Sequence, residues 1–497
     1  MMRSLFSGVS GLKSHQTRMD VIGNNIANVN TIGFKSSRVT FADTLYQTQS
    51  GAAAPTGTVG GTNPKQIGLG VGVASVDLLF NDASPQATGK NTDLALSGNG
   101  LFVVSTDAAG KDKYYTRAGN FSFDANYNYV VPGSGYHVVG WNADENGSID
   151  TKGTPEGIKI KDAMRSMGAK ATTTISYKGN MNSSVPTITS IRNQTGNLVA
   201  SPAKVDGVTN TSLTLTLSDG TTQTVTAKSN YEYRTKCSMP ITTIANVYDS
   251  LGNLHKVPFL FTKVPGTGTP PLKYDEWEVS LSPATTSGGA LDPLGQCSIK
   301  EDDGSWTTVK MTTKRLKFDQ SGKYTSGAGD PELTLENGAG STSPTPPSPV
   351  PTMTAMVDLK SLTQYSGSDT IKADYDGHSA GTLKEINTDQ SGILTGTYTN
   401  GEKRALAQVA VAQFDNAPGL TKAGANLYTE SNNSGTANIK TVSALGLTLT
   451  PSALEMSNVD VANEFADMVV TQRGFQSNSK IITVGDEMLE TVINMKR

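Results

Sequence analysis

The sequence predicts a mainly β chain with an α-helix at each terminus, built from nested, elongated domains rather than from consecutive ones. Two observations lead to this fold class. Apolar residues recur at every seventh position near both ends, and the long stretch between them consists of Gly- and Thr-rich, alternating runs typical of strands. Because the two helical ends match, the simplest topology completes each β-rich domain with segments from both halves of the chain.

The first 30 residues predict an amphipathic helix. Such seven-residue spacing makes one narrow apolar stripe, the seam of a coiled coil. The stretch Asn24–Asn28, followed by Gly33, predicts where the helix stops, since Asn and Gly tolerate the left-handed backbone required there. The N-terminal stripe consists of Leu5, Val9, Leu12, Met19 and Ile26.

Residues 459–497 predict a second, longer helix, which could span about 50 Å at 1.5 Å per residue. The capping-box motif at Ser452–Glu455, or Ser457 just after it, is expected to begin this helix. The C-terminal stripe consists of Val461, Phe465, Met468, Phe475, Ile482, Leu489 and Ile493.

Together these two stripes are the predicted subunit interface, in which the helices join each other and neighbouring copies. The alternative is a helical hairpin packed within one molecule. Polar and small residues interrupt the pattern, and each helical Gly costs about 1 kcal/mol relative to Ala, so we expect the helices to be marginal before they meet partners. The interruptions are Gly8, Gly11, Gln16, Gly23, Gln472, Gly474, Ser479 and Asp486.

Between the helices, Phe34, Val39, Phe41 and Leu45 predict extended or mixed structure, and residues 51–65 predict a stretch that is mobile or extended on its own. The residues that follow predict short strands. Residues 337–352, rich in Pro, Ser, Thr and Gly, predict an exposed spacer. Two apolar runs around a Gly-Asn-Gly turn predict a pair of strands within Leu94–Val104. Further strands are expected at Tyr114–Phe123, Leu213–Thr226, Ile241–Tyr248, Lys256–Val264, Trp277–Leu281, Gly381–Ile386, Ile393–Thr397 and Ala407–Phe414.

Composition excludes several functional classes. The formal net charge is −3 and the pI about 5.9, so no strongly basic surface indicates nucleic acid as a partner. Mean hydropathy is −0.30 and no run of about 20 apolar residues occurs, so we expect no membrane insertion. Polar residues from Lys13 to Asp20 interrupt the first 23 residues, which therefore lack the apolar centre of a cleaved secretory signal.

The residues also predict no enzyme and no cofactor. The four histidines, His15, His137, His255 and His378, have no partners at metal-ligand spacing, and no nucleophile or nucleotide-binding motif occurs. Residues 142–150 imitate the start of a calcium-binding EF-hand loop, but Gly153 stands where the bidentate Glu should be. A hydrophilic turn is the favoured interpretation of this loop, with calcium as the alternative. Cys237 and Cys297 are too few to organise the fold.

Several motifs resemble the family of bacterial flagellar rod and hook proteins. Residues Tyr115–Gly119 and Val247–His255 resemble the hook proteins of that family in particular. The signature residues near the two ends are Asn24, Asn25, Ile26, Asn28, Gly33, Phe34, Ser457, Asn458, Val459 and Asp460.

The resemblance implies a structural subunit of the flagellar hook, a curved helical tube that acts as a universal joint and transmits torque from rod to filament. It implies a coiled-coil-like inner domain from residues 1–30 and 459–497, and a bridging segment at 31–74. A β-rich middle domain would comprise 75–167 and 367–448. The outer domain, 168–366, would carry an extra subdomain at about 184–234.

The resemblance also implies partners and a location. The partners are other copies of the chain, the distal rod, the hook-cap protein, the hook–filament junction protein and the flagellar export apparatus. The location is the extracellular hook and basal body, reached without a cleaved signal peptide. Some hook proteins are crosslinked when a cysteine loses its sulfur and a neighbouring lysine adds to it, which makes Cys237 a candidate. The alternatives are a distal-rod or other axial protein, or a secreted β-rich adhesin.

Overall fold

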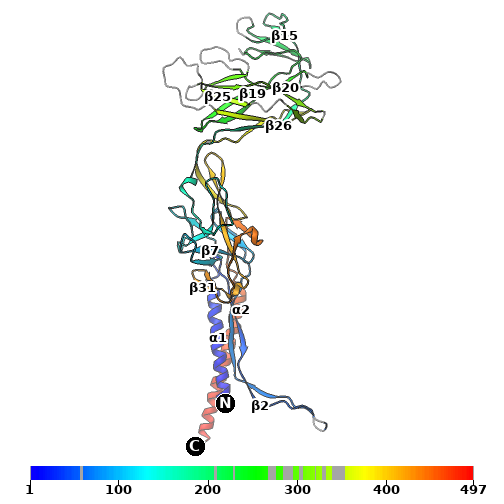
Figure 1. Cartoon of the computed structure of the whole chain (residues 1–497). Coiled ribbons are helices and arrows are strands. Elements are labelled where there is room, and N and C mark those ends of the chain that lie inside the picture. Colours follow the sequence, from blue (N-terminus) through cyan, green and yellow to red (C-terminus); the bar gives the residue numbers. More distant parts are fainter. Residues whose placement is uncertain are drawn as a thin grey trace. The chain divides into compact units, whose positions relative to one another are not determined.

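The computed structural model of this chain describes residues 2–55, 57, 60–205, 210–227, 230–266, 276–283, 295–300, 306–319, 321–326, 332–337 and 353–495. The chain divides into two compact units, and the first is assembled from both ends of the sequence (Figure 1). The spacer predicted at 337–352 lies outside the described residues, except for Asn337. The first unit comprises Met1–Arg165 with Leu383–Arg497, and the second comprises Ser166–Thr382.

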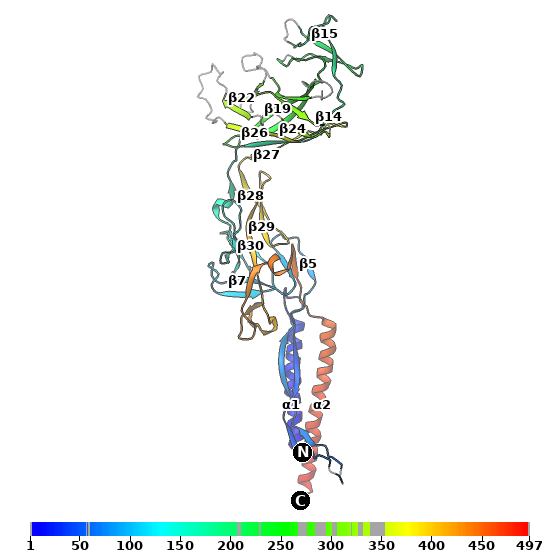
Figure 2. The same ribbon diagram turned by 45° about the vertical axis from the view of Figure 1, so that its right-hand side comes forward.

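Two antiparallel helices, α1 (Met2–Ala27) and α2 (Val461–Asn494), lie side by side in the first unit, which confirms the predicted fold class (Figures 1 and 2). The predicted start of α2 was wrong. Asp460 is its N-cap, because its side chain accepts hydrogen bonds from the backbone N–H of Ala462 and Asn463. Within the described residues, neither helix combines the length and apolarity needed to cross a bilayer.

The segment after α1 folds into two nested strand pairs, one continuing beyond the other. The first pairs β1 (Ser37–Asp43) with β4 (Val71–Leu78) and packs along α1. Ser14 donates to the Val71 carbonyl across this contact, and the backbone N–H of Val71 donates to the Ser10 hydroxyl. The second hairpin pairs β2 (Tyr46–Ser50) with β3 (Lys65–Gly68), and every residue of these two strands is exposed.

The β-sheet of the first unit pairs strands from opposite ends of the chain. β30 lies between β29 and β11 and also pairs with β7, so the C-terminal part is inserted among N-terminal strands. The main order is β28 (Gly381–Thr388), β29 (Ile393–Tyr398), β30 (Lys403–Gln413), β11 (His137–Asn142), β7 (Leu101–Ser105), β8 (Lys113–Thr116), β32 (Leu427–Thr429) and β31 (Thr421–Gly424). Shorter strands at its margins are β9 (Ser122–Phe123), β10 (Tyr129–Val130), β12 (Glu156–Gly157) and β33 (Asn438–Thr441).

Two small ladders connect this unit to the start of α2. One joins β5 (Pro85–Ala87) to β35 (Ala453–Glu455), and the other joins β6 (Leu94–Ser97) to β34 (Thr448–Pro451). Because residues 453–455 are paired in a strand, they cannot form the capping box that their sequence predicts.

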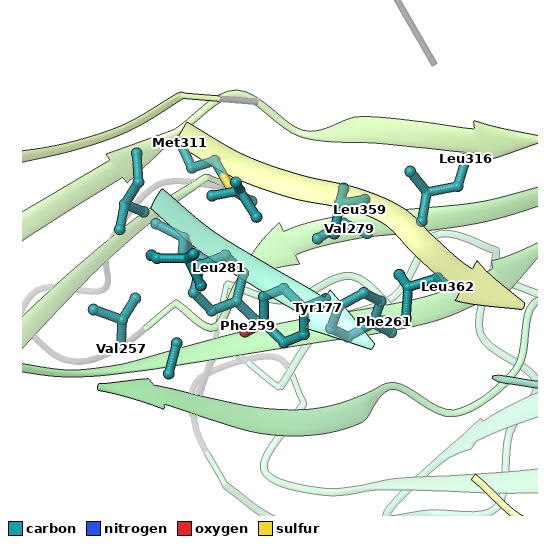
Figure 3. Close-up of a cluster of buried hydrophobic side chains, with 14 of the residues drawn as sticks. Tyr177, Val257, Phe259, Phe261, Val279, Leu281, Met311, Leu316, Leu359 and Leu362 are labelled. Carbon is teal, nitrogen blue, oxygen red and sulfur yellow. The ribbon is translucent and has the colours of Figure 1, made fainter. Parts of the chain in front are cut away.

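In the second unit, one apolar core contains residues from two sheets, with side chains such as Tyr177, Phe259 and Leu359 meeting inside it (Figure 3). The first sheet is β21 (Gln296–Lys300), β22 (Trp306–Met311), β25 (Glu332–Asn337), β26 (Met353–Tyr365), β14 (Thr174–Asn182) and β27 (Lys372–Tyr375). The second is β18 (Ile241–Tyr248), β19 (Leu254–Val264), β20 (Glu276–Leu281), β23 (Lys314–Phe318) and β24 (Tyr324–Ser326). β13 (Ser166–Met167) pairs with the first residues of β28.

A third, smaller sheet in this unit has an apolar core of its own, containing Ile191 and Leu215. It consists of β15 (Ile188–Asn193), β16 (Leu213–Leu217) and β17 (Thr222–Val225). The single run predicted at Leu213–Thr226 is therefore a hairpin, in which the alternation continues through a turn with Gly220 at φ +85°.

Six turns in the described part of the chain share one hydrogen-bond pattern, and the calcium-like loop is one of them. In that loop, Asp144 Oδ1 accepts from the backbone N–H groups of Asn146 and Ser148, and Gly147 has φ +81°. The same contacts, to the second and fourth following residues, recur at Asp124, Asn193, Asp249, Asp319 and Asp389. The carboxylate that resembled a calcium ligand therefore caps a turn.

A comparable carboxylate joins two strands of the second unit. Asp376 follows β27 and accepts from the backbone N–H groups of Thr173 and Thr174, just before β14. Burial alone would raise the pKa of Asp376, but these hydrogen bonds and that of the Thr173 hydroxyl outweigh it and lower the pKa to about 2.

We expect Asp376→Asn to destabilise the second unit at neutral pH by about 1–2 kcal/mol, allowing for solvent screening at this half-buried site. A depressed carboxyl pKa stabilises the fold above about pH 4, and this stabilisation is lost as the pH falls through about 2. Urea unfolding from pH 7 to pH 2 should therefore show the two proteins converging. Asp374→Asn is the control, because its ion pair with Lys178 is exposed. A pH-independent difference would contradict the assignment.

Candidate assembly interface

The contact between α1 and α2 depends on glycines that admit side chains of the opposite helix. A Cβ atom at Gly485 would lie 2.6 Å from Leu5 Cδ2, and one at Gly11 would lie 2.8 Å from the Asn478 side chain. Of the predicted helix-weakening glycines, Gly8, Gly11 and Gly474 lie in this contact, whereas a Cβ at Gly23 would meet nothing within 4 Å.

His15 illustrates this packing at the middle of α1. A Cβ at Gly474 would meet its ring at 2.7 Å, and the ring of Phe41 in β1 lies 5.6 Å away, centroid to centroid. Burial and the nearby Arg18 cation lower the pKa of His15. Arg18 in turn forms an ion pair of 3.1 Å with Asp467 of α2. His15, which carried no predicted role, thus lies where both helices and the hairpin meet.

Most of the predicted interface residues line this intramolecular contact. Eight of them are partly buried: Leu5, Leu12, Met19, Ile26, Val461, Met468, Ile482 and Leu489. The other four remain exposed: Val9 (39%), Phe465 (51%), Phe475 (38%) and Ile493 (66%).

Between the main heptad positions of α2, the residues that face α1 come one position earlier than the sequence pattern predicts. Glu464, Thr471, Asn478 and Gly485 face α1, in place of Phe465, Gln472, Ser479 and Asp486. Thr471 is fully buried, and its hydroxyl donates to the Asp467 carbonyl within its own helix. Small and hydrogen-bonded side chains here allow a close approach that a bulky apolar row would prevent.

The signature residues Asn25 and Asn458 hold the helices to the base of the β1–β4 hairpin. Asn25 Nδ2 donates to the Ser37 carbonyl and to Glu464 Oε1 of α2. Asn458 Oδ1 accepts from the backbone N–H of Ser36, and its Nδ2 donates to the carbonyl of Leu79. Each amide therefore joins segments from both ends of the chain.

The other N-terminal signature residues shape the turn that leaves α1. Asn28 Nδ2 donates to the Asn24 carbonyl and thereby closes the last helical turn. Gly33 has φ +67°, and a Cβ there would lie 2.6 Å from the backbone nitrogen of Ala118, so only Gly fits. Phe34 is buried beneath Lys422, whose Nζ lies 4.7 Å from the ring centroid.

The C-terminal signature residues form the last turn before α2. Ser457 Oγ accepts from the backbone N–H of Val459, and Asp460 caps the helix. We call the whole contact region, residues 25–37, 79–82, 96–98, 117–118 and 455–460, the helix–sheet joint.

A buried charge cluster lies at the centre of the helix–sheet joint. Glu455 Oε1 is 2.6 Å from Lys35 Nζ, and its Oε2 is 3.2 Å from Arg117 Nη1. All three side chains are at most 2% exposed. Burial lowers the pKa of Lys35, and the Glu455 carboxylate only partly offsets this. Lys35 Nζ also donates to the Asn81 carbonyl, and Arg117 donates to the carbonyls of Leu96 and Gly98.

Sequence reasoning did not single out this cluster. Arg117 lies inside the quoted motif Tyr115–Gly119 and Lys35 directly follows the signature residue Phe34, but no spacing relates them to Glu455, which lies 420 residues after Lys35. The only indication of buried charges in the sequence was a positively charged residue beside apolar residues in each of the two motifs.

The two cysteines are buried in the second unit and form no disulfide. Burial raises the pKa of the Cys237 thiol, and Arg234 opposes this shift. The adjacent Lys236 is exposed and has φ +68°. Within the described residues, no group of three or more His, Cys, Asp or Glu side chains could hold a metal ion.

Four family models match the chain, and they place it among the rod and hook proteins that form the axis of the bacterial flagellum. They are the flagella basal body rod protein (residues 5–35), the flagellar hook protein FlgE/F/G D1 domain (95–182), the flagellar basal body protein FlaE D2 domain (238–378) and the flagellar basal body rod FlgEFG protein C-terminal model (450–495).

Full-length relatives specify the family. The chain is 36% identical to the flagellar hook protein FlgE of Treponema pallidum over 520 residues, covering 100% of both chains. It is also 36% identical to FlgE of Borreliella burgdorferi over 507 residues, again covering 100% of both. The Bacillus subtilis flagellar basal-body rod protein FlgG is 53% identical over 142 residues, but this covers only 29% of this chain and 52% of the relative. The chain belongs to the flagellar hook protein family.

We expect Glu455→Gln to destabilise the first unit by about 3–5 kcal/mol, because Lys35 and Arg117 would lose their buried counter-charge. Urea unfolding combined with hydrogen exchange of the β6 and β35 amides would measure the loss. The control is Asp82→Asn, which removes a carboxylate 3.5 Å from Arg117 that is 45% exposed. Its effect should stay within about 1 kcal/mol, and equal effects for the two variants would refute the role of burial.

Gly11→Leu should separate the two helices and lower the melting temperature of the helical circular dichroism signal in the unassembled subunit. Gly23→Leu is the matched control, because a Cβ at Gly23 meets nothing within 4 Å. The control should be neutral or stabilise by up to about 1 kcal/mol through helix propensity. Similar melting of both variants would show that the helices do not pair in the free chain.

Proposed function

We infer that this chain is the structural subunit of the bacterial flagellar hook, and that its copies polymerise into the curved tube joining rod to filament. The observation that carries this inference is the full-length similarity to hook proteins, which extends over both helices and the inserted second unit. The role is mechanical, and no catalytic step is assigned to any residue.

The two helices are proposed to be the polymerisation elements. They already pair within the chain, yet Val9, Phe465, Phe475 and Ile493 remain exposed on their surfaces. A soluble monomer rarely leaves so many apolar side chains uncovered, so neighbouring copies are the natural cover. A contact between unlike surfaces that does not close on itself would extend into a helical polymer.

Torque transmission is proposed to combine a fixed inner tube with outer β-rich domains that slide past one another during bending. This domain division, with residues 168–366 as the outer part, remains a prediction from the resemblance. Support comes from the apolar cores of the second unit, which contain residues of that unit alone.

The further partners are also proposals based on family membership. They are the distal rod at one end of the tube, the hook-cap protein during growth, the hook–filament junction protein afterwards, and the flagellar export apparatus. Export without a cleaved signal peptide, and final location in the extracellular hook, belong to the same proposal.

A rod protein is the nearest alternative function, and the similarity to FlgG supports it over 142 residues. The hook assignment is preferred because the FlaE D2 domain model matches residues 238–378, within the inserted unit. A secreted adhesin would leave the paired terminal helices and their exposed stripes without a purpose.

Electron microscopy of the purified chain under polymerising conditions should reveal tubes with the curvature of a hook. Removing residues 1–30 and 459–497 together should abolish them, because both helices would be lost. Circular dichroism should verify that the truncated protein keeps its β-structure. Tubes that still form from such a protein would disprove polymerisation through the helices.

Cys237 remains the proposed site of a covalent crosslink between copies. Loss of its sulfur as hydrogen sulfide would leave a dehydroalanine, to which a lysine Nζ of a neighbouring copy adds. Because the thiol is only 4% exposed, assembly would first have to uncover it. Boiled polymer should give a multimer ladder on denaturing gels that Cys237→Ser removes and Cys297→Ser leaves. A wild-type polymer that boils to monomer alone would exclude the crosslink.

A further inference from the structure

The solvent side of α2 carries a second row of apolar residues that α1 does not cover. The row has heptad spacing, with steps of seven, four, three, four, three and four residues, so its natural partner is another helix. Its members are Val470, Ser477, Ile481, Val484, Met488, Thr491 and Met495. The five apolar members are between 39% and 77% exposed. We call these residues the second row of α2.

The solvent side of α1 carries a matching row, which we call the outer row of α1. It too has alternating steps of three and four residues, and all its members are exposed: Phe6, Val9, Lys13, Gln16, Asp20, Gly23 and Ala27. Only its beginning is apolar, with Phe6 66% and Val9 39% exposed. The β1–β4 hairpin leaves this row free, because it packs on Ser10 and Ser14 instead.

The two rows lie on opposite sides of the helical pair. Successive residues of a helix are rotated by about 100° around its axis. Going along the chain, the outer row of α1 lies roughly a quarter turn after the side of α1 that contacts α2. The second row of α2 lies roughly a quarter turn before the side of α2 that contacts α1. Because the helices are antiparallel, equal and opposite rotations point to opposite sides. A copy displaced sideways without rotation therefore brings its outer row onto the second row of the first copy.

The apolar parts of the rows also match along the helix axis. Within the chain, Leu5 faces Gly485, so Phe6 and Val9 lie at the same end of the pair as Val484 and Met488. At the other end, Arg18 pairs with Asp467 and Asn25 with Glu464, so Asp20 and Gly23 of α1 lie beside the first ten residues of α2, where Val470 is the only apolar member of the second row. Copies arranged side by side in the same direction therefore bring the apolar ends of the two rows together.

We propose that the second row of α2 in one copy packs antiparallel against the outer row of α1 in the next copy. This inference rests on the proposed function, since it names the partner surface of the polymerisation helices. Each copy uses one row on either side, so the contact repeats without closing in a dimer. α2 then touches two α1 helices, one from its own chain and one from a neighbour.

Disulfide trapping tests this contact in polymer grown from the full chain. Val9→Cys is combined in turn with Ile481→Cys, Val484→Cys and Met488→Cys, which covers about two helical turns of axial displacement between copies. The matched control combines Val9→Cys with Thr483→Cys, which is also exposed but lies on the far side of α2. The parent chain, with Cys237 and Cys297 buried, gives the baseline.

At least one of the three pairs should give a multimer ladder on non-reducing gels, at least about tenfold stronger than the control pair. A control ladder as strong as the others, or no ladder above baseline from any of the three, would overturn the proposal. Pelleting of the parent chain under the same conditions separately tests the proposed function. Polymer that forms without these crosslinks would refute the helix contact but not the proposed function.

Charge substitutions at the crosslinking pair provide a second measurement. For Val9 with Val484, Val9→Glu or Val484→Lys alone should reduce the pelleted polymer by at least about tenfold, since each buries an unpaired charge. The double variant should recover to within about threefold of wild type. Because the two residues do not touch within one chain, recovery requires contact between copies. A double variant no better than the worse single one would contradict the proposal.

Discussion

The buried carboxylate of Glu455 is the contact on which the first unit depends, because it holds three distant parts of the chain together. Its two oxygens bind Lys35 from the turn after α1 and Arg117 from the β-sheet. Neither cation could remain buried without it, since an unpaired buried charge is strongly destabilising. The strand that carries Glu455 pairs with β5, so the carboxylate also fixes where α2 begins. The cluster therefore joins the turn after α1, the β-sheet and the strand that precedes α2.

The helical pair combines two requirements that oppose each other. Glycines at positions 8, 11, 474 and 485 weaken each isolated helix, yet they let Leu5, His15 and Asn478 fill the space between the two. Close approach in turn leaves broad outer surfaces on both helices, and these carry the exposed apolar rows. A bulky seam would make a more stable hairpin, but it would give each helix less surface for a neighbour. Marginal helices with uncovered rows are suited to ordering as copies join.

The sequence was informative wherever a local pattern determined the structure. Seven-residue spacing predicted both helices, and alternating apolar residues predicted β18 at its observed bounds, Ile241–Tyr248. The start of α2 failed because Ser452–Glu455 has the composition of a capping box, whereas pairing with β5 takes these residues into a strand. The prediction that Phe465 and the residues at its heptad spacing face α1 was wrong for a related reason. Hydrophobicity pointed to Phe465, whereas close packing selects small or hydrogen-bonded residues such as Thr471. Both errors arose where a tertiary contact overrode a local preference.

The charge cluster shows a different limit, since nothing local relates residues 420 positions apart. The long separation also has a consequence for folding. Lys35 and Arg117 precede Glu455 in the chain, and β7 and β11 precede their partner β30, so the first unit cannot complete its sheet or neutralise its buried cations until residues 403–455 are present. The second unit does not depend on residues 403–455, because it contains all strands of its own core. A chain that emerges from its N-terminal end would therefore form the second unit first, and would close the helix–sheet joint only as α2 becomes available. The pairing of α1 with α2 is then the last step that completes the first unit.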